Sequence, residues 1–275
     1  MNEDAQGTNH IVCYLDLLGY THLVKDHADD LEKIRGIQRV FEGAVGMIDG
    51  FKTMPEKFST FEEHRKLAHR ISLRISSDST IFSMPLLGLS RLRSEIDIET
   101  NTFAYLSGFL DKISMFCLFV TGKLAHLYRG GIAIGQHYED ALNNNPGYQF
   151  IFSKAMVEAY EIERSATYPR IVFGEGVDAN FKKMLTEAGY LFLDPTDNKL
   201  CLDIYGRLDA TKEGAQKVLR EICEGIPKAI RYYRHNHPQE FFDRMRSKYE
   251  WWIACHNLRT KELGFPADIQ INAQI

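Results

Sequence analysis

Two aspartates occupy positions where a carboxylate is unusual and could have a chemical role. Asp16 lies within the apolar run of residues 11–18, where an ionised carboxylate is costly unless it is paired or binds a cation. Asp78 is flanked by serines at the centre of residues 70–83, where turn formation alone would also explain it. If the two carboxylates converge, they supply the oxygen ligands that hard divalent cations take. The pair therefore indicates a site for one or two such ions.

The segment that follows Asp16 suits phosphate. Residues 17–21, Leu-Leu-Gly-Tyr-Thr, turn sharply toward a helix, and such a turn directs backbone N–H groups at a phosphate. Gly19, Tyr20 and Thr21 are thus candidate phosphate-binding residues. Beside two metal ligands, they indicate a triphosphate held as its magnesium complex. The predicted chemistry is phosphoryl or nucleotidyl transfer.

Strands and helices must position these groups. Apolar residues recur at helical spacing in residues 31–48 and 103–127, whereas residues 70–83 alternate like two strands joined by a tight turn. The resulting order contains the β-α-β-β-α-β arrangement of ferredoxin-like folds. The predicted elements are a strand at 11–18, a helix at 31–50, a hairpin at 70–83, a helix at 103–127, a strand at 128–135, a helix at 153–163 and a strand at 170–173.

We therefore predict an α/β (α+β) fold with a ferredoxin-like core in residues 8–175 and a helical C-terminal extension in residues 176–275. The extension is expected to hold a helix, two short strands and two later helices, packed on the core or on a dimer partner. Its aromatic residues, from Tyr232 to Trp252, suit that packing. Its basic residues, including Lys248, alternate with acidic ones, which is typical of a solvated helix face.

Composition narrows the function classes. The 275 residues are 44% hydrophobic and 25% charged, which is typical of a folded globular protein rather than a disordered chain or a rod. The net charge of -4 provides no broad positive field for nucleic acid. The five cysteines lack C-x-x-C spacing, the start is polar and acidic, and no stretch reaches the ~20 apolar residues that cross a bilayer. We expect a cytoplasmic protein without membrane or nucleic-acid partners.

Four sequence blocks resemble a known family. YLDLLGYTHLV, RISSDSTIF, YRGGIAIG and FSKAMVEAYEIERSATYPRIV resemble blocks of the class III nucleotide cyclases, and most closely those of the pyrimidine nucleotide cyclases of bacterial anti-phage (Pycsar) systems. The similarity runs in order over residues 10–173. It implies a lyase that forms a 3′,5′-cyclic nucleotide and pyrophosphate from a nucleoside triphosphate.

The resemblance also implies roles for the residues above. Asp16, Asp78 and the carbonyl of Leu17 would hold two Mg²⁺ or Mn²⁺ ions, which activate the ribose 3′-hydroxyl and offset the charge of the departing pyrophosphate. The enzyme would be a homodimer with its active sites at the subunit interface. Its product would be a second messenger for antiviral defence that activates a separate effector protein.

Arg74 is the candidate reader of the base. It precedes Asp78 by four residues, so an extended strand places the two about 13 Å apart on one face. The matching position helps to select the base in purine cyclases. Arginine offers only donors, which suit the O4 and O2 acceptors of uracil, so UTP is favoured over CTP. A cross-strand ion pair would also account for Arg74.

One position departs from the family. Purine cyclases usually carry an asparagine and an arginine where this chain has Val157 and Glu161, so the usual transition-state arginine is absent. Three nearby cations are candidates to replace this arginine, although each of them also suits a structural ion pair. These are Arg129, Lys154 and Arg170.

Three other functions stay open. They are a cytidylate cyclase making cyclic CMP, another nucleotidyl transfer such as dinucleotide synthesis, and a non-catalytic, cyclase-like regulatory module. The motif at residues 235–238, His-Asn-His-Pro, lacks a neighbouring carboxylate or cysteine pattern and is predicted to be a polar loop between helices.

Overall fold

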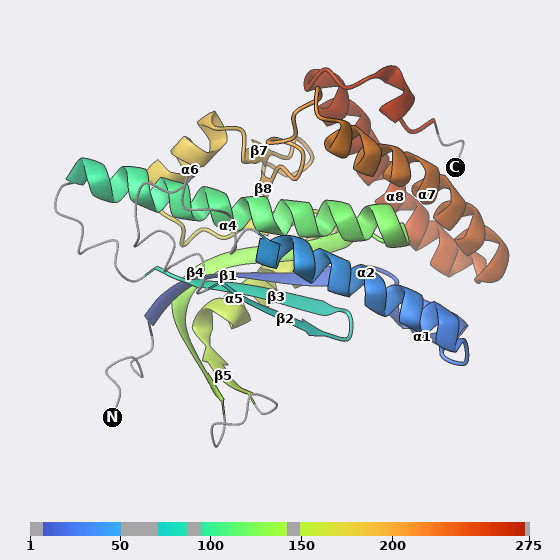
Figure 1. Ribbon diagram of the computed structural model, residues 1–275, viewed down its shortest axis with the longest axis horizontal. Helices are drawn as coiled ribbons and strands as arrows, with labels where there is room; N and C mark the ends of the chain where they lie inside the picture. Colours follow the sequence, from blue (N-terminus) through green and yellow to red (C-terminus); the bar gives the residue numbers. More distant parts are fainter. Residues whose placement is uncertain (1–7, 51–70, 87–94, 142–148, 273–275) are drawn as a thin grey trace.

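A mixed sheet organises the molecule. The computed structural model describes residues 8–50, 71–86, 95–141 and 149–272. Across these residues the strand order is β2-β3-β1-β4-β6-β8-β7, and β5 pairs with the outer part of β4 (Figure 1). The strands are β1 (Thr8–Leu17), β2 (Ser72–Ser76), β3 (Ser79–Pro85), β4 (Tyr128–Ala141), β5 (Gln149–Ser153), β6 (Ile171–Phe173), β7 (Leu191–Leu193) and β8 (Leu200–Leu202).

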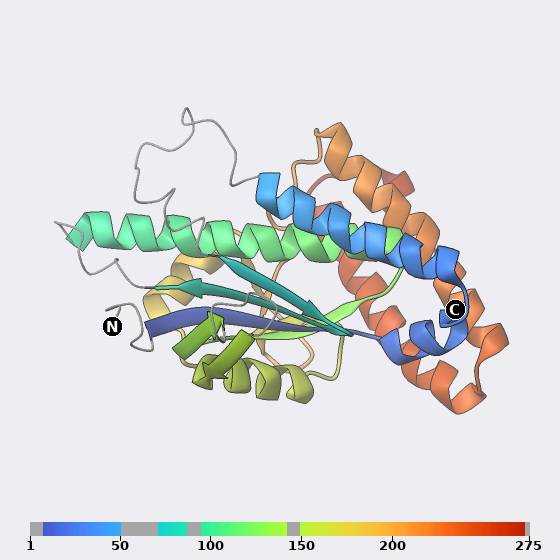
Figure 2. The ribbon, with the colours of Figure 1, turned by 60° about the horizontal axis from the view of Figure 1, so that its bottom comes forward.

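Helices cover both faces of the sheet and one end of it. Helices α2 and α4 lie over one face, α5 lies on the other, and α7 and α8 stand beyond the strand ends where α1 begins (Figures 1 and 2). The order from β1 through α2, β2, β3 and α4 to β4 confirms the predicted β-α-β-β-α-β core. The helices are α1 (Tyr20–His27), α2 (Leu31–Gly50), α4 (Glu95–Leu124), α5 (Lys154–Ser165), α6 (Ala179–Glu187), α7 (Glu213–Asn236), α8 (Gln239–Glu262) and the 3₁₀ turn η5 (Ala267–Ile269).

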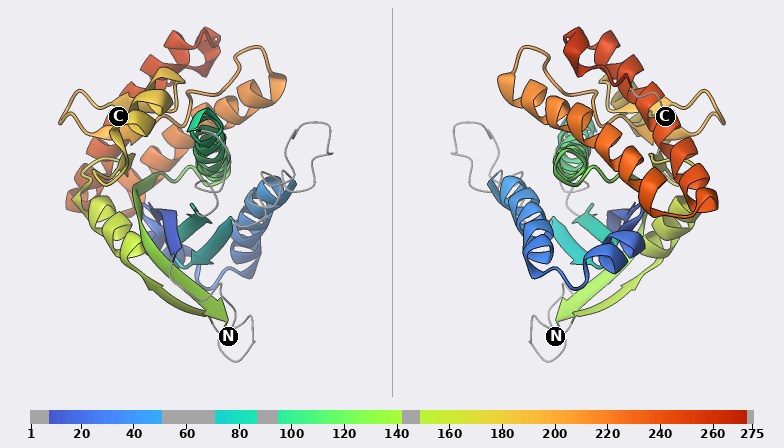
Figure 3. Two further views of the ribbon diagram at one scale, coloured as in Figure 1. Left: turned by 90° about the vertical axis from the view of Figure 1, so that its left-hand side faces the viewer. Right: turned by 90° about the vertical axis from the view of Figure 1, so that its right-hand side faces the viewer.

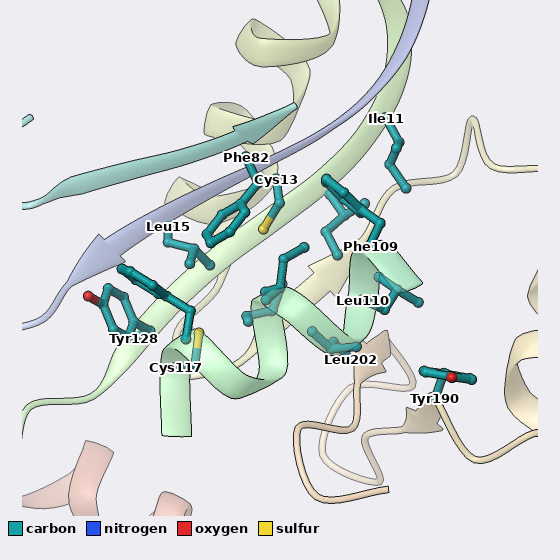
Figure 4. Close-up of a cluster of buried hydrophobic side chains, with 14 of the residues drawn as sticks. Ile11, Cys13, Leu15, Phe82, Phe109, Leu110, Cys117, Tyr128, Tyr190 and Leu202 are labelled. Atoms are coloured by element: carbon teal, nitrogen blue, oxygen red, sulfur yellow. The ribbon is translucent and has the colours of Figure 1, made fainter. Parts of the chain in front are cut away.

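The alternation of β1 decides which of its side chains enter the core. Ile11, Cys13 and Leu15 are fully buried in the cluster that includes Phe109 and Phe116 of α4 (Figure 4). The intervening residues therefore face the opposite side of the sheet. Asp16 is one of them, so the fold places its carboxylate on the α5 side and away from the main core.

Helix α5 lies unusually close to the sheet. A Cβ atom on Gly131 of β4 would come within 2.1 Å of the carbonyl oxygen of Ala159, so only glycine permits this approach. The helix predicted at residues 153–163 is confirmed, and Ser153 is its N-cap, because the Ser153 hydroxyl accepts a hydrogen bond from the Met156 amide at 2.9 Å. The Gly-Gly pair in YRGGIAIG thus positions α5 over β1 and β4.

The extension shares the sheet of the core. Strand β8 pairs with β6 through Cys201 and Val172, so the sheet continues across the expected boundary near residue 175. Helices α7 and α8 form a second apolar cluster with η5, seen beside the sheet in Figure 3. The predicted loop of residues 235–238 is shorter in the structure, because His235 and Asn236 belong to the last turn of α7 and only His237 and Pro238 join α7 to α8. In the described ranges, no helix is long and apolar enough to span a bilayer.

Candidate active site

The two aspartates lie on neighbouring strand ends. Strand β1 pairs with β3 so that Asp16 stands opposite Ser79, the residue after Asp78. The amide of Leu17 donates a hydrogen bond to the carbonyl oxygen of Asp78 at 2.9 Å. The hairpin turn itself carries Ser77 at φ 57°, a left-handed conformation that costs a non-glycine residue free energy. The fold therefore holds the two carboxylate-bearing segments together.

The electrostatics of Asp16 suit a bound cation. Its side chain is 23% exposed and lies 3.5 Å from Nη2 of Arg129. Burial raises the pKa of Asp16, Arg129 opposes that rise, and the nearby charge of Asp78 adds to it. A divalent ion would relieve both the burial cost and the repulsion between the carboxylates. In the ranges that the structure describes, no group of three or more His, Cys, Asp or Glu side chains could hold a metal ion. The two carboxylates and the Leu17 carbonyl remain the predicted ligands.

A buried glutamate anchors Arg129. Glu163 of α5 has a side chain only 3% exposed, and its Oε1 accepts a hydrogen bond from Nε of Arg129 at 2.5 Å. Nη1 of Arg129 also donates to the carbonyl of Ala166 at 3.2 Å. Burial raises the pKa of Glu163, and the arginine opposes this. Nη2 of Arg129 also pairs with Glu163, so these contacts fix the guanidinium, and the same Nη2 reaches Asp16 at 3.5 Å.

Tyr14 and Ser79 support the hairpin aspartate. Their hydroxyl oxygens lie 2.5 Å apart, and the Ser79 hydroxyl lies within 3.4 Å of Oδ1 of Asp78. Tyr14 is also two residues before Asp16, on the same face of β1. The chain of hydroxyls restricts how the Asp78 carboxylate turns.

The turn after Asp16 presents free amides. Gly19 adopts φ 83° and caps α1 without a side-chain hydrogen bond, so the first N–H groups of the helix lack intrahelical partners. The side chain of Tyr20 packs against the main core and Thr21 is exposed, so both offer chiefly their amides. Behind the turn, the Tyr233 hydroxyl donates to Nε2 of His126 at 3.1 Å, and a Cβ on Gly19 would come within 2.7 Å of that hydroxyl. The turn is therefore rigidly backed by α7.

Arg74 lies farther along the same face of the sheet. In register it shares a row with Ile81 and Tyr14, two positions from the row of Asp16. Its guanidinium pairs with Glu139 of β4, which also lies 3.2 Å from Nε2 of His137. Burial lowers the pKa of His137 to about 4, so this imidazole is neutral at pH 7. The position thus combines the donors of arginine with a carboxylate acceptor.

The other two candidate cations are engaged elsewhere. The Arg170 guanidinium pairs with Asp194 and Asp197 of the extension, and its side chain is only 2% exposed. The exposed Lys154 pairs with Glu158 on the surface of α5 at 4.0 Å. Of the three cations, only Arg129 contacts Asp16.

Helix α8 brings an unforeseen cation to the site. Lys248 is half-buried rather than solvated. Burial is the main cause that lowers its pKa, the charge of Arg129 lowers it further, and the charges of Asp16 and Glu163 raise it. The basic pattern of α8 did not distinguish it from its exposed neighbours. For Glu163 a signal does exist, because residues 155, 159 and 163 recur at helical spacing on the buried face of α5.

Comparison with known proteins adds a coarse structural similarity. No protein-family model and no curated protein matches this sequence. A guanylyl cyclase domain of the RhoGC fusion protein from the aquatic fungus Blastocladiella emersonii aligns at 9% identity and TM-score 0.40, over 71% of this chain and 93% of that chain. The adenylyl cyclase CyaB from P. aeruginosa aligns at 8% identity and TM-score 0.39, over 71% and 92%. The guanylyl cyclase Cya2 aligns at 15% identity and TM-score 0.39, over 73% and 95%.

Proposed function

We propose that this chain is a class III nucleotide cyclase that converts UTP into 3′,5′-cyclic UMP and pyrophosphate. The observation that carries the proposal is the Leu17–Asp78 hydrogen bond, which holds the two aspartate-bearing strand ends side by side. A carboxylate pair at this point, next to free helix amides, suits a metal-bound triphosphate. Replacing Asp16 or Asp78 with alanine is expected to abolish turnover while the circular dichroism spectrum stays unchanged. Full turnover by both variants would overturn the assignment.

Each group has a defined task in this proposal. Asp16, Asp78 and the Leu17 carbonyl would hold two Mg²⁺ or Mn²⁺ ions. Such ions, when bound, lower the pKa of a ribose 3′-hydroxyl and offset the charge of pyrophosphate. The amides of the Gly19 turn bind the phosphates, as helix N-termini bind anions. Arg129, held by Glu163, balances the negative charge around Asp16 and so takes the place expected for a transition-state cation.

The base would be read beside Arg74. Its donors suit the O4 and O2 acceptors of uracil, which supports UTP. The paired Glu139 adds an acceptor that suits the exocyclic amine of cytosine, so CTP is the second candidate substrate.

A second copy of the chain would complete the enzyme. The outer face of β5 and α5 exposes large apolar side chains, led by Phe152 at 75% and Val157 at 52%. Phe150 and Tyr160 extend this patch, at 45% and 41% exposed. Apolar patches on a surface mark interaction sites, and this one adjoins the face that carries Asp16. We therefore place the homodimer interface on the β5–α5 patch.

The biological role follows from the same resemblance. Cyclic UMP would act in the cytoplasm as a second messenger of anti-phage defence, recognised by a separate effector protein. No nucleic acid or membrane partner is part of this role.

A further inference from the structure

Helix α8 of the extension is held firmly against the end of the sheet that carries Asp16. The hydroxyl of Tyr249 donates a hydrogen bond to the carbonyl of Ala125 at 2.9 Å, just before β4 begins. Two residues farther along the helix, Trp251 stacks on Tyr168 with ring centroids 5.2 Å apart and planes 10° apart. These two anchors fix the rotation of α8 and its distance from the strand ends.

Lys248 directly precedes Tyr249, so the same anchors fix its position. It is half-buried, and it forms no hydrogen bond or ion pair with any residue that the structure describes. Asp16 and Glu163 attract its charge, whereas Arg129 and Arg244 repel it. An ammonium group that is partly removed from water without a direct partner is costly, so a ligand is the natural explanation for keeping it there.

We propose that Lys248 binds the triphosphate tail of the substrate, so that the C-terminal extension supplies a phosphate-binding cation to the catalytic core. This inference rests on the proposed function for the identity of the substrate. Lysine binds phosphate as a compact charge, which suits a group of oxygens that shifts as a bond breaks. Arg129 is already committed to Glu163 and Ala166, so Lys248 is the cation of this cluster with its donors still available.

This role differs from a purely structural one. If Lys248 only balanced the charge of Asp16, its removal would change folding stability and leave phosphate affinity unaltered. If it binds phosphate, its removal weakens phosphate binding, because a charged donor to the phosphate oxygens is lost.

The test measures binding of inorganic tripolyphosphate, in the presence of Mg²⁺, to the full-length chain by calorimetry. We expect Lys248→Gln to weaken binding by about tenfold or more, as for the loss of a charge-assisted hydrogen bond. Lys248→Arg should retain most of the affinity. Lys261→Gln, at an exposed lysine on the same helix, should bind like the wild type. Thermal unfolding should show that all variants are folded at the temperature of the binding measurement.

Two results would overturn the inference. One is wild-type affinity in Lys248→Gln, and the other is a wild-type chain that does not bind tripolyphosphate. Failure of the proposed function is seen separately. If the wild type forms no cyclic nucleotide, but Lys248→Gln still weakens tripolyphosphate binding, the phosphate site stands and the cyclase reaction is rejected.

Discussion

The backbone of Leu17 is hydrogen-bonded to the backbone of Asp78, 2.9 Å from amide nitrogen to carbonyl oxygen. This single bond joins the end of β1 to the tip of the β2–β3 hairpin. It sets the separation of the two carboxylates without using either side chain, so both remain available for cations. The site is thus built by sheet register, which a change of side chain at either aspartate leaves intact.

Asp16→Asn separates the catalytic and structural roles of the carboxylate. Burial and the neighbouring Asp78 raise the pKa of Asp16, so its ionised form opposes folding at neutral pH when no metal is bound. We expect the variant to unfold at a higher temperature than the wild type without divalent ions, and to lose turnover. Added Mn²⁺ should raise the unfolding temperature of the wild type only. A metal-free variant less stable than the wild type would contradict this electrostatic interpretation.

Gly19→Ala tests the turn that presents the amides. Alanine at φ 83° is strained, and its Cβ would meet the Tyr233 hydroxyl at 2.7 Å. We expect a loss of about 1–3 kcal/mol of stability in urea unfolding and at least a tenfold loss of turnover. Gly46→Ala is the matched control, because its Cβ meets nothing within 4 Å in the middle of α2.

The double variant Gly19→Ala with Tyr233→Phe separates the two costs. Removing the hydroxyl relieves the clash but not the backbone strain, so the two changes should be less than additive in stability. Full additivity would show that Tyr233 does not press on the turn.

Phe152→Glu tests the dimer. This side chain is 75% exposed on β5, so a charge there should leave the monomer stable while disrupting an apolar interface. Light scattering should show a dimeric wild type and a monomeric, inactive variant. Leu193→Glu, at a side chain 57% exposed on β7, should stay dimeric and active. A monomeric wild type with full activity would refute the shared site.

Arg74→Gln tests the reading of the base. Because the change removes charged donors far from the phosphates, kcat/KM for UTP should fall about tenfold or more, whereas tripolyphosphate affinity stays constant. Glu139→Gln should lower activity with CTP more than with UTP, since the carboxylate is the acceptor of the pair. Equal losses for both nucleotides in both variants would mean that this ion pair is structural.

Three buried histidines, His126, His137 and His256, make the fold sensitive to acid, because burial lowers the pKa of each. Burial lowers the pKa of His137 and of His256 to about 4. Unfolded histidine titrates near about 6.5, so between that value and about 4 only the unfolded chain takes up these protons. The contribution of these two histidines to stability is therefore constant above about pH 6.5 and falls below it, by about 1.4 kcal/mol per pH unit for each of them.

Urea unfolding at about pH 7 and about pH 5.5 measures this slope. His137→Gln should remove the contribution of His137 to this pH dependence. The contribution of His256, which lies between the Ile269 carbonyl and the Tyr205 hydroxyl, should remain. Equal stability of the wild type at both pH values would contradict the assignment.

The sequence predicts those parts of the fold that local patterns encode. A continuous apolar run predicts β1, alternation predicts the β2–β3 hairpin, and Ser153 marks the start of α5, because strand faces and helix caps depend on neighbouring residues. The pairing of β8 with β6 was not predictable, because each of these strands has only three residues and shows no alternation. The position of β5 was missed because its residues follow a segment that reads as loop.

The candidate site divides in the same way. Asp16 and Asp78 stand out because a carboxylate in an apolar strand or at a serine-rich turn is locally unusual. Glu139 and Lys248 do not, because charged residues are common on strands and helices. Only the tertiary fold shows that Glu139 pairs with Arg74 and that Lys248 lies near Asp16. Arg170 looked equally suitable in sequence, yet the extension supplies Asp194 and Asp197 to bind it.

Identification of the product tests the central claim most directly. The purified chain is incubated with Mn²⁺ and each of the four ribonucleoside triphosphates in turn, and products are identified by mass spectrometry. We expect cyclic UMP and pyrophosphate from UTP, and neither from the Asp16→Asn variant. Cyclic CMP alone would keep the two-aspartate chemistry and discard uracil selection by Arg74. A linear dinucleotide, or no cyclic product from any triphosphate, would contradict the cyclase assignment.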